Sequence, residues 1–152
     1  NIFNIENNPT AGYSNLILSY KEGITPELGK FIHTTGINGV ALLPSGPTPP
    51  NPLELLSSAN NRMLLEFLKG QFDIVLIDCP PALGLSDALV MSKYTDVNII
   101  TITNASTKID QLESVKKAFE KVDSKISGVI INKAKVKGSS YSSYYADKYY
   151  SE

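Results

Sequence analysis

An aspartate at the end of an apolar run is the first residue whose type and position suit chemistry. Residues 72–77 read Phe-Asp-Ile-Val-Leu-Ile, and Asp78 follows them directly, before Cys79 and two prolines. In open parallel sheets, ligands bind outside the carboxyl ends of the strands. A carboxylate there can hold the water shell of a Mg²⁺ ion on nucleotide phosphates, or orient an attacking hydroxyl. An aspartate that only ends a strand and caps a turn gives the same pattern, so both interpretations stay open.

A second polar side chain ends another apolar run. Residues 128–131 read Gly-Val-Ile-Ile, and Asn132 and Lys133 follow them. The planar amide of an asparagine carries both a donor and an acceptor, which suits the edge of an adenine ring. Asparagine is also a frequent turn residue, and the sequence alone does not separate the two roles.

The third candidate is a cluster of tyrosines near the end of the chain. Five of the eight tyrosines lie there: Tyr141, Tyr144, Tyr145, Tyr149 and Tyr150. Residues 133–152 contain few aliphatic side chains, so we predict a mobile tail that buries little apolar surface. Exposed hydroxyls on such a tail are suited to accept phosphate. The alternative is an aromatic tail that docks on a groove or on a partner.

Alternating strands and helices are predicted to position these groups. Strands are expected at 40–43, 72–77, 97–102 and 126–131, and helices at 52–68, 87–93 and 108–122. The β-branched runs in two of the strands are typical of strands buried on both faces. We therefore predict an α/β fold in which the last three strands are parallel neighbours, with the first and last helices packed on the faces of the sheet.

Composition narrows the class of protein. The 152 residues are 42% apolar and carry a net charge of −1, with Arg62 as the only arginine. A nucleic-acid partner is not expected, because readers of base sequence show a basic surplus and arginine forks. The single Cys79 fits a reducing compartment, and the single His33 disfavours a histidine metal cluster or a Ser-His-Asp triad. No apolar run approaches the roughly 18 residues that span a bilayer, and the first residues do not resemble a signal peptide.

Several segments resemble one family, in the same order as in that family. Residues 46–56 contain P-P-N-P-L-E-L-L, residues 73–81 resemble a Walker B segment, and residues 86–88 resemble the D-A pair that follows it. Residues 128–133, the tyrosine cluster and residues 1–18 also have counterparts. The chain thus resembles the bacterial tyrosine kinases of capsule and exopolysaccharide biosynthesis, which belong to the deviant P-loop class with the MinD/ParA ATPases.

The resemblance implies a P-loop NTPase-like fold, ATP and Mg²⁺ as cofactors, and tyrosine autophosphorylation. By resemblance, Asp78 serves the metal and catalysis, Asn132 contacts adenine, and the terminal tyrosines are the acceptors. It also implies a cytoplasmic protein, recruited to the inner face of the membrane by a transmembrane polysaccharide co-polymerase that activates it. Self-association into a ring or another homo-oligomer and a phosphotyrosine phosphatase are the other implied partners.

One part of the family pattern is absent from the sequence. There is no G-x-x-x-x-G-K-[ST] loop, which supplies the amide cradle and the lysine for the phosphates, and no second Walker motif. We therefore expect residues 1–132 to be the C-terminal part of a kinase domain, with residues 133–152 as a flexible tail, and expect this chain alone to be inactive. A MinD/ParA-type ATPase and a non-catalytic regulatory half-domain that presents tyrosines remain the alternatives.

Overall fold

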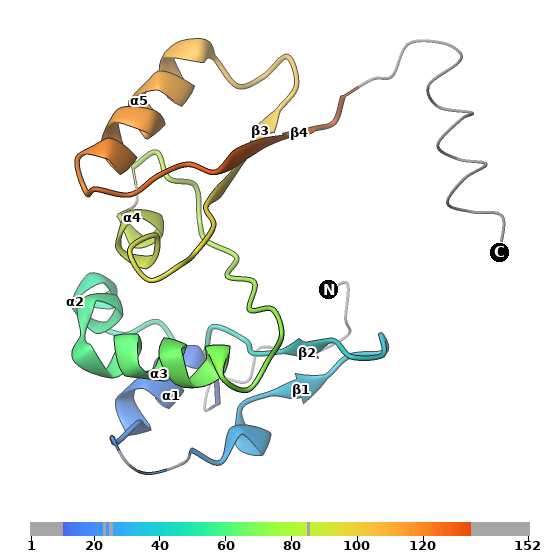
Figure 1. The fold of residues 1–152 in the computed structure, drawn as a ribbon, viewed down its shortest axis with the longest axis vertical. Coiled ribbons are helices and arrows are strands. Elements are labelled where there is room, and N and C mark those ends of the chain that lie inside the picture. The colour runs from blue at the N-terminus through green and yellow to red at the C-terminus, as the bar shows by residue number, and fades with distance from the viewer. Residues whose placement is uncertain (1–10, 23, 25, 85, 135–152) are drawn as a thin grey trace, which may run out of the picture.

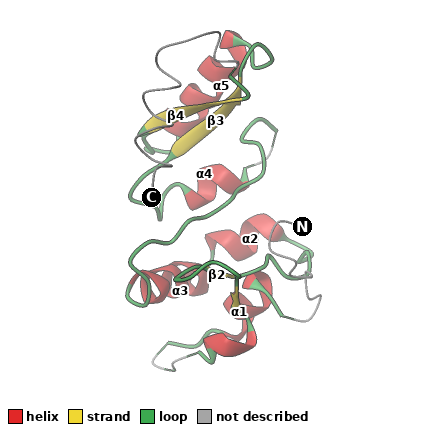
Figure 2. Ribbon diagram, turned by 90° about the vertical axis from the view of Figure 1, so that its right-hand side faces the viewer, coloured by secondary structure: helices red, strands yellow, loops and turns green. Residues whose placement is uncertain are grey.

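The computed structural model describes residues 11–22, 24, 26–84 and 86–134 of the chain. Its helices are α1 (Tyr13–Ser19), α2 (Pro52–Ser57), α3 (Ala59–Lys69), α4 (Asp87–Met91) and α5 (Ile109–Glu120), with a 3₁₀ turn at Leu28–Lys30. Its strands are β1 (His33–Thr34), β2 (Ala41–Leu42), β3 (Ile99–Thr103) and β4 (Gly128–Asn132). Figure 2 shows β3, β4 and α5 in one half of the molecule, and α1, α2, α3 and β2 in the other.

A parallel strand pair confirms the α/β prediction. β3 and β4 run parallel, with Ile99 opposite Gly128 and Thr103 opposite Asn132. α5 connects the two strands and lies beside them (Figure 1). Its apolar stripe forms as expected, since Val115 and Phe119 are both buried. The carboxyl ends of both strands therefore meet at one edge of the pair.

The predicted strand at 72–77 does not form. Among the described residues this segment joins no sheet, although its residues alternate between exposed and half-buried, as those of a strand do. Ile74 and Leu76 are 77% and 90% exposed, whereas Val75 packs against the core. The apolar composition favours a strand, but a strand exists only through hydrogen bonds to a neighbour. No strand among the described residues pairs with it, so the predicted sheet of three neighbouring parallel strands is wrong.

The other departures have local causes. The helix expected at 52–68 is divided at Ser58, whose backbone is extended and whose Oγ accepts a hydrogen bond from the Asn61 amide as the N-cap of α3. α3 does not cover the parallel pair. Its Leu64 and Leu68 instead form a core with Leu16 and Ile17 of α1. The strand expected at 40–43 is the short β2, which pairs antiparallel with β1 in a separate hairpin.

Two loops pack backbone against backbone beside α1. The Tyr13 amide donates to the Pro44 carbonyl at 2.7 Å, and the Ser14 amide donates to the Ser45 carbonyl at 3.0 Å. A Cβ at Gly12 would lie 2.2 Å from the Gly46 nitrogen. Glycine is required at position 12 by this close approach, since any side chain would push the two loops apart.

Replacing Gly12 by alanine is therefore expected to lower the free energy of unfolding by about 3 kcal/mol, the upper range for overpacking. Urea denaturation followed by circular dichroism measures the change. Gly29→Ala is the matched control, because nothing lies within 4 Å of a Cβ there, and it should change stability by less than about 0.5 kcal/mol. Equal stabilities for the two variants would contradict the tight contact.

Candidate functional site

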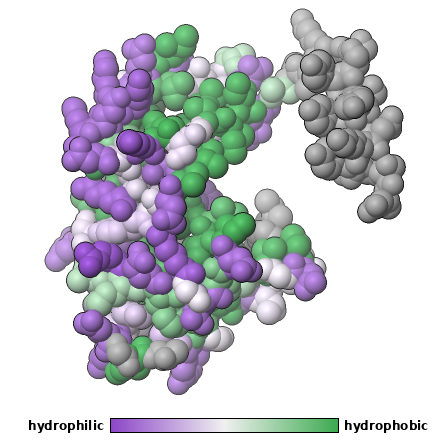
Figure 3. Space-filling view, viewed as in Figure 1, coloured by the Kyte–Doolittle hydropathy of each residue, from purple (hydrophilic) through white to green (hydrophobic). Residues whose placement is uncertain are grey.

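A groove runs between the extended segment and the parallel strand pair. Its volume is about 900 Å³, with residues 72–83 on one side and 97–102 on the other. Leu112 and Val115 of α5 and Met91 of α4 also line it. Figure 3 shows apolar residues on both sides of the hollow between the two halves of the molecule. The groove is thus lined by both apolar and polar side chains and is bounded by two extended stretches of chain.

Asp78 lies in the wall of this groove, at the carboxyl end of the extended segment. The residue is exposed and, within the described part of the chain, its carboxylate has no hydrogen-bond or ion-pair partner. Pro80 and Pro81 fix the backbone that follows, because each proline ring locks φ. The carboxylate predicted from the sequence is therefore available to a ligand, and it lies at the end of the extended segment 72–77.

A second acidic residue, Asp87, is not among the site residues predicted from the sequence. The pKa of the half-buried Cys79 thiol is raised first by burial and then by the charges of Asp78 and Asp87, but Asp87 does not line the groove. Asp87 is the first residue of α4. The signal for it in the sequence is an acidic residue in the first turn of a helix, which also suits the helix dipole.

A buried network of polar contacts is centred on Asn61 of α3. The Tyr13 hydroxyl donates to Asn61 Oδ1, and Asn61 Nδ2 donates to the Leu56 carbonyl at 2.6 Å and to Met91 Sδ at 3.6 Å. Burial raises the pKa of Tyr13, with further contributions from Cys79 and Tyr94. The contact links α1, α3 and α4, and no pattern in the sequence indicates it.

Asn132 ends β4 at the edge where both strands finish. Its Oδ1 accepts from the Lys133 amide at 2.7 Å, and its carbonyl accepts from the Asn104 amide at 2.9 Å. Ala105 and Lys133 both have positive φ, so the chain turns sharply after each strand. Asn132 is exposed but does not line the groove that contains Asp78. The structure therefore places Asn132 at the end of β4 and Asp78 at the end of the extended segment, and it does not bring them into one cavity.

The donor set suits a hard cation that keeps most of its water. Within the described ranges, no three His, Cys, Asp or Glu side chains are placed to hold a metal ion together. Mg²⁺ is usually bound through one or two carboxylates, with water and substrate phosphates completing the shell. The exposed Asp78 carboxylate fits that requirement. The five terminal tyrosines lie outside the described residues.

Comparisons with known proteins agree with the geometry. No protein-family model matches the sequence. It is 39% identical over 101 residues to tyrosine-protein kinase Ptk of Acinetobacter johnsonii, covering 66% of this chain and 14% of that protein. It is 36% identical over 107 residues to tyrosine-protein kinase YwqD of Bacillus subtilis, covering 70% of this chain and 45% of that protein.

The fold matches that of solved kinase domains. The crystal structure of the VpsO kinase domain superposes with a TM-score of 0.73 at 30% identity, covering 84% of this chain and 60% of that domain. The chain thus spans less than two thirds of each of these proteins. By sequence and by fold, the chain is a relative of the bacterial tyrosine kinases and corresponds to part of their kinase domain.

Proposed function

We propose that the chain is the C-terminal part of an ATP-dependent protein-tyrosine autokinase that regulates capsule or exopolysaccharide synthesis. The observation that carries the proposal is the exposed Asp78 carboxylate at the end of the extended segment 72–77, within a fold that matches part of a kinase domain. Residues 1–132 would form the partial kinase domain, and residues 133–152 the tail that carries the tyrosines.

Each candidate residue then has one task. Asp78 would hold the water shell of Mg²⁺ and would orient the attacking hydroxyl, and Asp87 would add negative charge to the same region. The side chain of Asn132 contacts the edge of adenine. The acceptors are Tyr141, Tyr144, Tyr145, Tyr149 and Tyr150, which a neighbouring subunit phosphorylates. When bound, ATP would supply the phosphoryl group, and Mg²⁺ would offset the negative charge on the phosphate oxygens.

The proposal also sets the partners and the place of action. A transmembrane polysaccharide co-polymerase would recruit the kinase to the inner face of the membrane and activate it. Copies of the kinase would self-associate, and a phosphotyrosine phosphatase would reset them. No helix in the described part of the chain has the length and apolarity needed to cross a bilayer.

The chain alone is expected to bind ATP no more tightly than millimolar. It contains no Walker A loop, and without the amide cradle and its lysine the phosphates lose their main contacts. Titration calorimetry with Mg²⁺-ATP measures the affinity, with the YwqD kinase of B. subtilis as the positive control.

A micromolar dissociation constant for the chain alone would contradict this account of the site. Weak binding is shared with a second candidate, a non-catalytic regulatory half-domain. The two differ when the rest of the kinase is supplied. A partial kinase domain then gains ATP binding and forms phosphotyrosine, whereas a regulatory half-domain gains neither.

A further inference from the structure

We propose that Asn61 is a positioning residue: its side-chain amide fixes α4 against α1 and α2, and thereby holds Asp78 in the place from which it acts. The inference rests on the proposed function for the role of Asp78. The contacts that carry it lie within the described part of the chain, so the positioning itself can be tested without ATP.

Asn61 places a polar side chain at an apolar position. It lies on the buried face of α3 with Leu64, Leu65 and Leu68, and its exposed fraction is 0%. The spacing of three and four residues puts these side chains on one face of the helix. A leucine at position 61 would be buried without the cost of removing an amide from water. The contribution of Asn61 must therefore come from what its amide binds.

The amide of Asn61 binds three other elements. Its Nδ2 donates to the Leu56 carbonyl at 2.6 Å and to Met91 Sδ at 3.6 Å, and its Oδ1 accepts from the Tyr13 hydroxyl. A carbonyl can only accept, so the contact with Leu56 fixes which way the amide faces. Leu56 lies in the last turn of α2, where carbonyls have no partner within the helix. One side chain of α3 thus joins α1, α2 and α4.

Met91 connects this network to the part of the chain that carries Asp78. It is the last of the five residues of α4, and a helix of that length spans only about 7.5 Å. A displacement of Met91 therefore moves all of α4, which follows Asp78 in the chain and lies between the two groups of elements in Figure 2. Val75, which precedes Asp78, packs against the α1–α3 core. Asp78 is thus held between one anchor before it and one after it.

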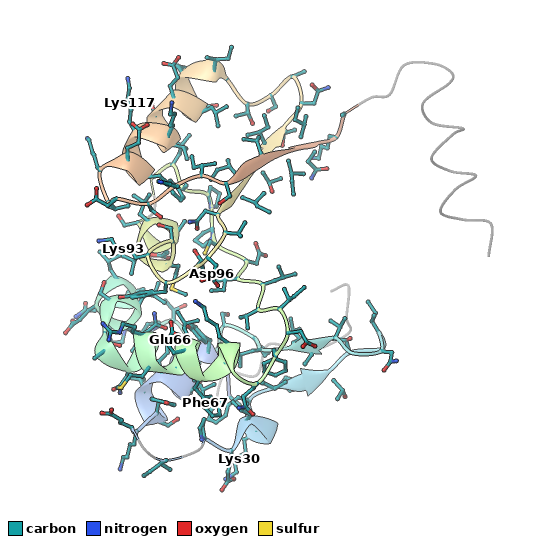
Figure 4. All side chains as sticks on the ribbon, viewed as in Figure 1. Lys30, Glu66, Phe67, Lys93, Asp96 and Lys117 are labelled. Carbon is teal, nitrogen blue, oxygen red and sulfur yellow. The ribbon has the colours of Figure 1, made fainter. Side chains whose placement is uncertain are left out.

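A surface ion pair also joins α3 to the chain after α4, but it is the weaker link. Lys69 Nζ is 3.2 Å from Asp96 Oδ1 and 3.7 Å from Glu66 Oε1, and Figure 4 labels both carboxylates. The Asp96 side chain is 83% exposed, and exposed ion pairs contribute little to stability. Hydrogen bonds in the interior are stronger, because water does not screen them. Of these two links, the buried amide of Asn61 therefore decides where α4 lies.

Alkylation of Cys79 tests the positioning in the chain itself. Cys79 is the only cysteine, is half-buried, and follows Asp78 directly. The double variant Tyr13→Phe/Asn61→Leu removes the hydrogen bond between these side chains without leaving either of them unpaired, so the fold should survive. Iodoacetamide at a fixed pH should modify Cys79 in the double variant at least about tenfold faster than in the unsubstituted chain, because this part of the chain then opens locally.

The neighbouring asparagine of α3 provides the matched control, Asn60→Leu. Asn60 Nδ2 donates to the Tyr20 carbonyl at 3.2 Å and to the Ile17 carbonyl at 3.4 Å, and in the described part of the chain no hydrogen bond joins it to α4. This variant should lower the urea midpoint of unfolding but change the alkylation rate by less than about twofold. An unchanged rate in the double variant would overturn the proposal. So would equal increases in both variants, because lost core stability would then explain them.

Kinetics of the complete kinase separate this proposal from the proposed function. The double variant should lower kcat for autophosphorylation by about tenfold and leave KM for Mg²⁺-ATP within about twofold, since the adenine contact is assigned to Asn132, outside the groove. A normal kcat in the double variant would overturn the positioning role and leave the proposed function intact. If the unsubstituted kinase forms no phosphotyrosine, the proposed function fails, and the alkylation rates alone decide whether Asn61 positions this part of the chain.

Discussion

Replacing Asp78 by alanine in the complete kinase is expected to lower autophosphorylation by about 100-fold or more. Phosphoryl transfer depends on positioned groups that organise the metal and the hydroxyl, and losing one of them commonly costs that factor. The fold should survive, because the side chain is exposed and has no partner among the described residues. Anti-phosphotyrosine detection with purified protein and Mg²⁺-ATP measures the rate.

Asp73 provides the matched control for this experiment. It is an exposed carboxylate on the same extended segment, but it lies at the opposite end from the proposed metal. Asp73→Ala should therefore keep most of the autophosphorylation. Near-normal activity of Asp78→Ala would remove Asp78 from the mechanism. Equal losses in both variants would indicate that charge along the segment matters more than the position of one carboxylate.

The parallel pair was predictable because its signal is local. Two runs of β-branched residues, at 97–102 and 126–131, are joined by a helix with a clear apolar stripe. This order favours a parallel β-α-β unit over other arrangements. The structure shifts the strands by only one or two residues, to Ile99–Thr103 and Gly128–Asn132. The carboxyl-end position of Asn132 follows from the same pattern.

The segment at 72–77 shows the limit of that reasoning. Its composition correctly indicates an extended backbone that ends at Asp78, the carboxylate of the candidate site. Whether it becomes a strand depends on a partner, and a partner is a property of the whole sheet rather than of six residues. The same limit explains the hairpin: the strand expected at 40–43 forms as β2, but its partner β1 has only two residues, too few to give a periodic signal.

Side-chain contacts between distant elements were the least predictable. The hydrogen bond from Tyr13 to Asn61 spans 48 positions in sequence, and neither residue type marks a buried site by itself. Asn132 ends β4 and Asp78 follows the extended segment, yet only Asp78 lines the groove. The end position of each residue was thus predictable from the sequence, whereas the cavity depends on how the two halves of the molecule pack.

Replacing the five tail tyrosines by phenylalanine in the full-length kinase is expected to remove nearly all phosphotyrosine. Five tyrosines within ten residues, among serines, make a poor core and accessible acceptors. Residues 133–150 could extend to about 60 Å at roughly 3.3–3.6 Å per residue, enough to reach a neighbouring active site. Tyr13 is unsuited as an alternative acceptor, because its hydroxyl is engaged with Asn61 and burial raises its pKa.

The same variant tests whether the tail controls assembly. Each phosphate adds about −1.5 to −2 charges at pH 7, so several phosphates outweigh the four lysines of residues 133–152. Repulsion between phosphorylated tails should then weaken self-association when ATP is added. The five-phenylalanine variant should still bind ATP and should stay associated, as analytical ultracentrifugation would show. Phosphotyrosine that persists mainly at Tyr20 or Tyr94 would make the tail a docking element and refute the switch, because the charge would then accumulate elsewhere.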